Sequence, residues 1–216
     1  MEYLTVALAK GRLAKDTMKE LRAAGMAAAV DLNSRKLVFR DAQDSVEYLL
    51  VKPVDVITYV DKGVADIGVV GKDIILEQGL DVYELLDLKF GKCTFAVAGF
   101  PGTKLYGPEK VLKIATKFPN IARKYFAGKR EIDITYLNGS VELAPLMNMS
   151  DCIIDLVETG TTLKENGLVV LEEMFDIQAK IIGNRASYTF FYDKIQKFLN
   201  AVKSEVSNDA TNYSWQ

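Results

Sequence analysis

The residues best suited to chemistry lie in segment 152–167, CIIDLVETGTTLKENG. An apolar run indicates a strand that reaches the surface, and Glu158, Thr159, Gly160, Thr161 and Thr162 then turn the chain into a helix. Glycine lets the backbone approach a ligand closely, the threonines supply hydroxyls, and a helix start offers unpaired N–H groups. Together these groups are suited to binding a phosphate monoester.

The plainer reading of this segment is a threonine-rich helix cap, since threonine is an ordinary N-cap residue. Asp155 and the apolar strand directly upstream favour phosphate binding. In this segment an acidic residue is followed by three residues and then by T-G-x-T. This order resembles the phosphoribosyl-diphosphate loop of type I phosphoribosyltransferases. That family has a second acid where Ile154 stands, which counts against ordinary type I membership and leaves the phosphate argument intact.

A second junction, ALAKGRL (7–13), places Lys10 and Arg12 on either side of Gly11 where a strand runs into a helix. Two cations and unpaired N–H groups would then face one point, as an anion site requires. The alternative is a pair of solvated charges at the start of a surface helix. The residues alone leave both readings open.

Three weaker segments also place functional groups at strand ends. ADIGVVGKD (65–73) has Gly68 and Gly71, which would allow close approach of a flat or anionic ligand. IATKF offers Thr116 and Lys117 at the end of a predicted strand.

The last of these segments is LNGSVELAP (137–145). It has Gly139 and Ser140 at a strand end, with Glu142 expected one turn inside the following helix. An acid there more often complements the helix dipole than catalyses.

Composition removes many other classes of site. The chain has 216 residues, 49% hydrophobic and 26% charged, as expected for one or two globular domains. Its histidine count is zero, which excludes His–Cys zinc sites, Ser–His triads and a histidine base. A net charge of −2 argues against a general nucleic-acid binder. Cys93 and Cys152 form no disulfide framework and have no metal-ligand spacing, so no protein metal site is predicted.

The sequence contains no predicted targeting or membrane segment. The N-terminus lacks a basic region followed by an apolar one, and the apolar runs fall well short of the roughly 20 residues of a membrane span. We therefore expect no signal peptide, no membrane association and a reduced, cytoplasmic location.

Short β-branched runs alternate with helical patterns, which predicts an α/β fold. The expected strands are 4–9, 36–40, 46–51, 66–70, 93–99, 112–116, 132–137, 152–157, 168–174 and 178–182. The expected helices are 11–24, 53–62, 72–78, 119–126, 140–147, 161–165 and 186–205. Phe190 and Phe191 in the last helix are interpreted as core, the tail 207–216 is expected to fray, and Trp215 has no functional interpretation.

Taken together, these segments resemble the ATP phosphoribosyltransferases, which open histidine biosynthesis. The similarity runs from Leu4 to about Gly183 and follows the family's order. Its motifs are LAKGRL, SRKLVF, VADIGVVGKDIILEQG, IATKFPNIARKYF, LNGSVELAP and DLVETGTTLKENGLVVLEEMFDI. The length is that of the family's short form, which lacks a C-terminal regulatory domain. The resemblance implies a histidyl-tRNA-synthetase-like regulatory subunit as partner, and a homodimer within a hetero-oligomer.

The family fold is two α/β domains arranged like a type II periplasmic binding protein, with the active site in the interdomain cleft. The resemblance therefore implies one domain from residues 1–90 plus 169–216 and a second from 91–168. Carboxyl ends of strands with glycine-rich turns are where ligands gather in such folds.

The reaction implied is attack by N1 of the adenine of ATP on C1 of phosphoribosyl diphosphate, with release of pyrophosphate. The attacking nitrogen is neutral, so no strong base is needed and the lack of histidine is no obstacle. The chemistry requires charge neutralisation and placement of two polyanions. Mg²⁺ would be held mainly by the substrate diphosphate, with few protein ligands.

The resemblance also implies roles for individual residues. The 158–162 loop would hold the 5-phosphate, Asp155 would lie near the ribose hydroxyls, and Lys10, Arg12 and Arg35 would meet the pyrophosphate as catalytic residues. Further substrate-binding candidates are Gly11, Gly71, Lys72, Asp73, Gly139, Ser140 and Glu142. Lys52 stands where the family commonly has arginine.

A rival from another class is a non-catalytic ligand-binding domain on the same fold, because fold alone does not separate the two. A periplasmic solute binder would need a signal peptide, and a transcription-regulator domain would need a helix-turn-helix. Two anion sites, T-G-T-T and K-G-R, favour the enzyme, because a binder of neutral solutes has no use for them.

Overall fold

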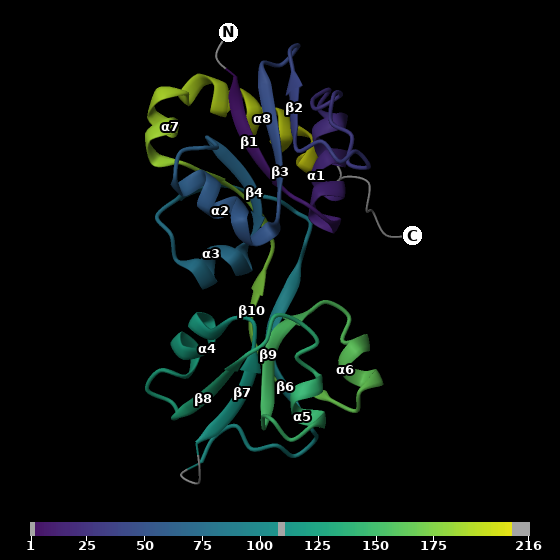
Figure 1. The fold of residues 1–216 in the computed structure, drawn as a ribbon, viewed down its shortest axis with the longest axis vertical. Helices are drawn as coiled ribbons and strands as arrows, with labels where there is room; N and C mark the ends of the chain where they lie inside the picture. The colour runs from purple at the N-terminus through teal and green to yellow at the C-terminus, as the bar shows by residue number, and fades with distance from the viewer. Residues whose placement is uncertain (1–2, 108–110, 209–216) are drawn as a thin grey trace. The chain divides into compact units, whose positions relative to one another are not determined.

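The computed structural model describes residues 3–107 and 111–208, without the side chains of 204–208. It divides into two compact units, each with its own sheet (Figure 1). Unit 1 comprises Met1–Ile75, Gly79–Gly91 and Gln178–Gln216, and unit 2 comprises Leu76–Gln78 and Lys92–Ile177. The predicted α/β class is confirmed.

Sheet A of unit 1 has the order β2-β3-β1-β4-β11-β5 among the described residues. Its strands are β1 (Leu4–Ala9), β2 (Val38–Asp41), β3 (Val46–Val51), β4 (Ile67–Gly71), β5 (Tyr83–Asp87) and β11 (Ala179–Gly183). Because β1 pairs in parallel with both β3 and β4, the carboxyl ends of these strands meet at one edge of the sheet.

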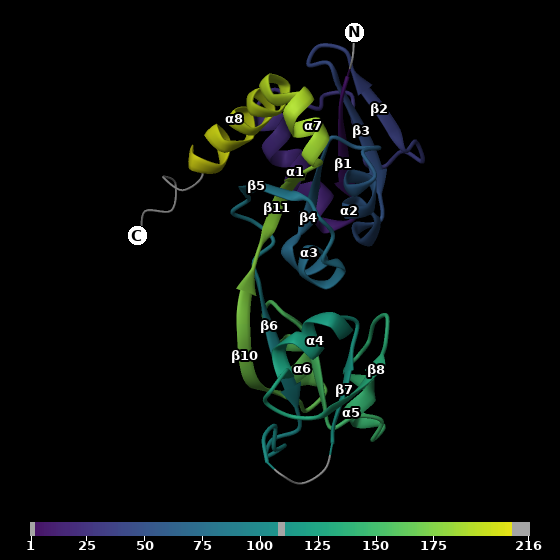
Figure 2. The same ribbon diagram turned by 90° about the vertical axis from the view of Figure 1, so that its left-hand side faces the viewer.

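Helices cover both faces of sheet A (Figure 2). They are α1 (Arg12–Ala23), α2 (Pro53–Asp61), α3 (Lys72–Gln78), α7 (Arg185–Phe190) and α8 (Tyr192–Asn208). Successive side chains of a strand point to opposite faces, so Leu4, Val6 and Leu8 join the core under α1 and α8. Ala7 and Ala9 join the core under α2.

Sheet B of unit 2 has the order β10-β6-β9-β7-β8 among the described residues. Its strands are β6 (Cys93–Gly99), β7 (Leu112–Thr116), β8 (Ile132–Tyr136), β9 (Cys152–Val157) and β10 (Val169–Ile177). Cys152 and Ile154 of β9 pack on the core that includes α4 (Pro119–Phe126). Ile153 packs on the opposite core with Ala144 of α5 (Leu143–Leu146) and Leu163 of α6 (Thr161–Glu165). The central strand is therefore buried on both faces.

Strand β10 belongs to a different unit from the one expected. The stretch from residue 169 onward was expected in the first domain, but β10 pairs antiparallel with β6 and so belongs to unit 2. The chain returns to unit 1 only at Gln178. β10 forms an outer strand of sheet B, and its register shifts between Val170 and Glu172 and again between Glu173 and Phe175.

Several expected elements are also corrected. The helix expected over 140–147 is only α5, because Ser140 has a left-handed φ of 48°. The helix expected over 186–205 is α7 followed by α8, separated by Phe191. Phe190 is 81% exposed, so its interpretation as core is wrong, whereas Phe191 packs against the core.

The remaining boundaries agree within a few residues, with one missed strand. β5, sequence YELLD, went unpredicted because acids flank its apolar pair. Trp215 and the end of the predicted tail lie outside the described residues. Within the described part, every helix is too short or too polar to span a bilayer.

Candidate active site

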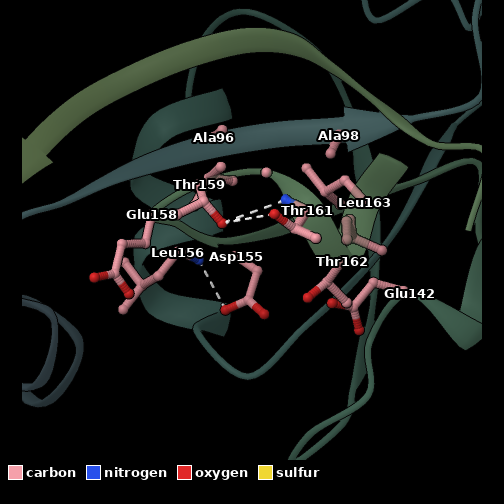
Figure 3. A pocket seen from close by; sticks show the side chains of 13 residues that line it. Ala96, Ala98, Glu142, Asp155, Leu156, Glu158, Thr159, Thr161, Thr162 and Leu163 are labelled. Carbon is pink, nitrogen blue, oxygen red and sulfur yellow. Dashed lines mark hydrogen bonds between the residues drawn. The ribbon is translucent and has the colours of Figure 1, made fainter. Parts of the chain in front are cut away.

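A hollow opens in unit 2 at the carboxyl end of β9 (Figure 3). Its empty volume, open mouth included, is about 650 Å³. The loop that continues β9 contributes most of its wall. The lining residues are Ala96, Ala98, Glu142, Ile153, Asp155, Leu156, Val157, Glu158, Thr159, Gly160, Thr161, Thr162 and Leu163. The structure thus brings the predicted phosphate loop, Asp155 and Glu142 together.

The loop turns into α6 through Gly160, which has a left-handed φ of 71° that other residues rarely adopt. Gly160 is the N-cap, and no side chain caps the helix. The hydroxyls of Thr159 and Thr161 lie 3.0 Å apart, and the Thr161 N–H reaches Thr159 Oγ1 only at 3.4 Å (Figure 3). The threonine contact to the backbone at the helix start is therefore a long one, and the N-cap position itself contributes no side-chain bond.

Asp155 is fixed by two contacts at the side of the hollow. Its Oδ1 accepts the N–H of Leu156 at 2.8 Å, and Lys117 Nζ lies 3.5 Å from the same oxygen. The ammonium also sits 4.9 Å from the centre of the Phe118 ring. Lys117, singled out in the sequence only as a strand-end cation, therefore offsets the charge of Asp155.

Thr116, the other strand-end candidate, serves the fold. It is fully buried, its hydroxyl donates to the carbonyl oxygen of Ile154 at 2.7 Å, and it accepts the N–H of Phe118 at 2.9 Å. These bonds tie the end of β7 to β9 and shape the turn into α4. The hydroxyl is thus fully used inside the protein.

The lining of the hollow is acidic rather than basic. Glu142, Asp155 and Glu158 contribute carboxylates, and the lining residues include no lysine or arginine. Ala96 and Ala98 of β6 also line it, and larger side chains there would fill the space. Sequence reasoning missed these alanines, although their alternate spacing on a strand was a usable signal. Gly139 and Ser140 are exposed and do not line the hollow.

The second predicted site lies at the carboxyl edge of sheet A in unit 1. Gly11 links β1 to α1 with φ 107° and ψ −151°, a backbone geometry open to glycine. The Lys10 N–H donates to the carbonyl oxygen of Val51 at 2.8 Å, which aligns the ends of β1 and β3. Lys10 and Arg12 are exposed. Lys52 directly follows the end of β3 and is the N-cap of α2.

Arg35 reaches the same edge through the strand register. The N–H of Leu50 donates to the carbonyl oxygen of Leu37 at 2.8 Å, and Leu50 is the register partner of Leu8. Arg35 precedes Leu37 in an exposed turn, so it lies beyond the strand ends, on the side of Lys10. Asp31 and Ser34 hold this turn through side-chain bonds to backbone N–H groups at 2.9 and 3.1 Å.

The 65–73 segment has mostly structural roles. A Cβ on Gly68 would lie 2.8 Å from methyl groups of Val56 and Val60, so this glycine is needed for the packing of α2 on β4. The expectation that Gly68 admits a ligand is wrong. A Cβ on Gly71 would clash with the carboxylate of Asp73, and Lys72 Nζ is paired with Glu84.

The protein-family model of ATP phosphoribosyltransferase, HisG, matches residues 52–204. The chain belongs to the ATP phosphoribosyltransferase family. An ATP phosphoribosyltransferase of Clostridioides difficile (strain 630) is 54% identical over 200 residues, covering 92% of this chain and 96% of that protein. One of Caldicellulosiruptor bescii is 54% identical over 191 residues, covering 85% and 90%.

Two solved structures place the fold. The ATP phosphoribosyl transferase (HisG:HisZ) complex from Thermotoga maritima has a chain 35% identical, with a TM-score of 0.84 and coverage of 95% and 99%. The periplasmic aliphatic sulphonate binding protein SsuA from Escherichia coli is 15% identical, with a TM-score of 0.57 and coverage of 98% and 75%. The second likeness concerns the fold alone and confirms the expected two-domain, periplasmic-binding-protein-like architecture.

The expected activity follows from family membership. The chain is a pentosyltransferase that transfers the phosphoribosyl group of phosphoribosyl diphosphate to N1 of ATP with release of pyrophosphate, the first step of histidine biosynthesis. The enzyme reading is thus confirmed over the non-catalytic binder. Which residues carry the reaction is a separate question.

Proposed function

We propose that the 158–162 loop holds the 5-phosphate of phosphoribosyl diphosphate and that Lys10, Arg12 and Arg35 meet its pyrophosphate group. The observation that carries this assignment is the start of α6, where Gly160 is left-handed and no side chain caps the helix. N–H groups and threonine hydroxyls there suit the oxygens of a phosphate monoester. Because α6 has only five residues, these local groups matter more than a helix dipole.

The acidic lining suits the sugar rather than the phosphate. Asp155, held by Lys117, would accept hydrogen bonds from the ribose hydroxyls. Glu142 and Glu158 lie in the same wall, and their charge favours the positive charge that develops at C1 as the pyrophosphate departs. The two regions thus divide the work, with acids around the sugar and cations for the leaving group.

Transfer in this scheme needs placement more than proton chemistry. The adenine N1 lone pair attacks C1 directly, and the C1–O bond to pyrophosphate breaks. Negative charge grows on the leaving oxygens, so the cations at the edge of sheet A would bind the transition state more strongly than the substrate. Gly71, Lys72 and Asp73 are assigned to the nucleotide side.

Mg²⁺ belongs to this proposal as a companion of the substrate. The described residues contain no group of three or more acid, histidine or cysteine side chains able to hold a metal. Diphosphate oxygens and water are ligands that Mg²⁺ commonly takes, with one or two carboxylates at most. The ion would neutralise part of the pyrophosphate charge, while the positions of the cationic side chains are set by sheet A.

For assembly, we propose a homodimer that joins a histidyl-tRNA-synthetase-like regulatory subunit. The solved relative from Thermotoga maritima is a HisG:HisZ complex, which supports this proposal. We also propose a cytoplasmic location, where ATP and phosphoribosyl diphosphate are made.

The direct test combines the chain with ATP, phosphoribosyl diphosphate and Mg²⁺ and follows formation of the phosphoribosyl-ATP adduct. Ribose 5-phosphate then probes the loop alone, with backbone amide shifts of Gly160 and Thr162 as the measurement. Saturable shifts at these amides are expected. Shifts elsewhere, with none in the loop, would move the 5-phosphate away from unit 2.

A further inference from the structure

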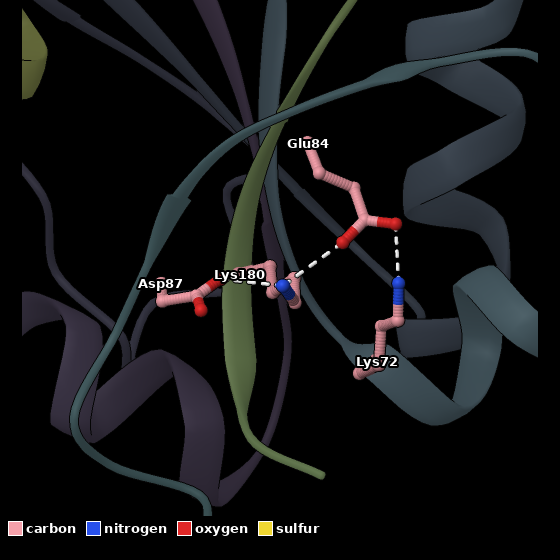
Figure 4. Close-up of polar contacts among 4 residues, drawn as sticks. All are labelled: Lys72, Glu84, Asp87 and Lys180. Atoms are coloured by element: carbon pink, nitrogen blue, oxygen red, sulfur yellow. Dashed lines mark hydrogen bonds and ion pairs between the residues drawn. The ribbon is translucent and has the colours of Figure 1, made fainter.

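Four alternating charges cross one end of sheet A in unit 1 (Figure 4). Lys72 Nζ contacts Glu84, Glu84 also accepts Lys180 Nζ at 2.9 Å, and Lys180 contacts Asp87. They come from the start of α3, from β5 and from β11, so the row spans three neighbouring elements. Neither the predicted motifs nor the proposed chemistry accounts for Glu84, Lys180 or Asp87.

The row is partly sheltered from water. The side chain of Lys72 is 23% exposed and that of Lys180 15%. Partial burial alone would raise the pKa of Glu84, but hydrogen bonds from Lys72 and Lys180 lower it below its usual value. Glu84 is therefore a carboxylate at neutral pH and attracts both lysines.

Lys72 lies at the edge of sheet A where the anion site is proposed. Leu8 of β1 is the register partner of Val69 of β4, so two residues further along Lys10 is level with Gly71. Because β1 and β4 are neighbouring strands, the end of β1 that precedes Lys10 lies beside the end of β4 that precedes Lys72. Glu84 offsets the charge of Lys72 when no anionic substrate is bound.

We propose that Glu84 is an internal stand-in for a substrate phosphate: it holds Lys72 while the edge is empty and releases it to the polyphosphate of a bound substrate. Lys180 keeps Glu84 in place during this exchange, because Lys180 still lies between Glu84 and Asp87 after Lys72 has left. Glu84 acts through Lys72 and is a positioning residue. This inference rests on the proposed anion site at the edge of sheet A.

The exchange makes Glu84 a competitor of the substrate. Replacing it by glutamine keeps the shape and removes the charge, so Lys72 becomes more available and pyrophosphate binds more tightly. A partly exposed ion pair contributes up to about 1 kcal/mol, so the expected gain is about two- to fivefold in affinity. A purely structural role for Glu84 predicts the opposite sign.

The test is a double-mutant cycle on the full chain. Magnesium pyrophosphate is the calorimetric probe and represents the polyphosphate of either substrate, that of the nucleotide included. The variants are Glu84→Gln, Lys72→Met and the double variant, with Asp87→Asn as a control that disturbs the far end of the row. Lys72→Met is expected to weaken binding about tenfold, and Glu84→Gln to have no effect in its background. Asp87→Asn is expected to leave the affinity unchanged, and Lys72→Arg to restore most of it.

The outcomes separate this inference from the proposed function. Weaker or unchanged binding in folded Glu84→Gln, or an equal gain in the Lys72→Met background, would overturn the exchange. If Lys10→Met and Arg12→Ala also leave pyrophosphate binding intact, the proposed anion site itself fails. If only those two variants weaken binding while the Lys72 and Glu84 cycle shows no coupling, the site stands and the exchange alone is rejected.

Discussion

The loop of unit 2 and the carboxyl edge of sheet A in unit 1 are both strand-to-helix junctions proposed as anion sites, yet they offer an anion different groups. The loop offers backbone N–H groups and threonine hydroxyls in an acidic wall, with Gly160 shaping the turn. The edge offers exposed cations on short connections, with Gly11 shaping the turn. In the proposed scheme, hydrogen-bond geometry recognises the fixed phosphate monoester, whereas positive charge stabilises the leaving group, whose own charge grows.

The largest expected effect concerns the cationic edge. Arg12→Ala and Arg35→Ala should each slow the chemical step by about a hundredfold, because the charge they meet is greatest in the transition state. Single-turnover kinetics measures this step directly, and Lys36→Ala, next to Arg35, is the matched control. An unchanged chemical rate with only a raised Michaelis constant would assign the arginines to uniform binding.

The loop of unit 2 should show an effect on binding instead. Thr159→Ala and Thr162→Ala each remove a hydroxyl facing a charged group, a loss of about 1.5–3 kcal/mol in phosphoribosyl diphosphate binding. ATP binding should change much less, as measured by calorimetry with each substrate. Lys164→Ala, on the same helix and outside the lining, serves as control. Equal losses for both substrates would mean that the loop is only a helix cap.

Salt should distinguish the two regions in a single experiment. Raising KCl from 0.1 to 1 M should weaken pyrophosphate binding about tenfold, because exposed charges are screened. Ribose 5-phosphate binding to the loop should respond less, since short N–H and O–H contacts carry it. If the affinities of the two probes depend equally on salt concentration, the proposed distinction between recognition by geometry and recognition by charge is wrong.

The smallest expected effect is on stability and depends on pH. Hydrogen bonds from Lys72 and Lys180 outweigh partial burial and lower the pKa of Glu84 from 4.5, so its contribution is present above that pH and is lost as the pH falls further. Bonds to Asp87 and Glu84 outweigh burial and raise the pKa of Lys180 above 10.5, so its contribution disappears only in strong base.

Thermal unfolding from pH 3 to 8 checks this claim. Glu84→Gln should melt below the wild type at pH 7, and the two curves should converge as the pH falls below 4.5. A difference that persists at pH 3 would mean that the substitution acts through packing rather than charge.

Sequence reasoning recovered the alternation of strands and helices and the loop of unit 2, because both depend on local patterns. The run CIIDLV is apolar enough to identify a buried strand, and Gly160 marks the turn. The pairing of Glu84 with Lys72 was missed because β5 carries little strand signal, and because β11, which lies between β4 and β5 in the sheet, comes from a distant part of the sequence. Gly68 was misread because its requirement comes from Val56 and Val60 of a neighbouring helix.

The dependence on the surrounding structure also explains the errors at element and domain boundaries. Ser140 adopts a left-handed φ that no local rule requires of a serine, so the helix start was placed too early. Phe190 continues an apolar stripe in the sequence, but the break at Phe191 turns it to solvent. β10 belongs to unit 2 because it pairs with β6, and the sequence alone does not indicate that pairing.

The irregular register of β10 has a consequence for behaviour at high protein concentration. A flat outer strand presents a continuous row of N–H and C=O groups on which another chain can add a strand, the first step of aggregation. The two register shifts interrupt that row, and Glu172, Glu173 and Asp176 add negative charge along it. The unevenness of β10 therefore acts as protection against self-association, and removing both extra residues, Leu171 and Met174, to even out its ladder would make the enzyme more prone to form fibres.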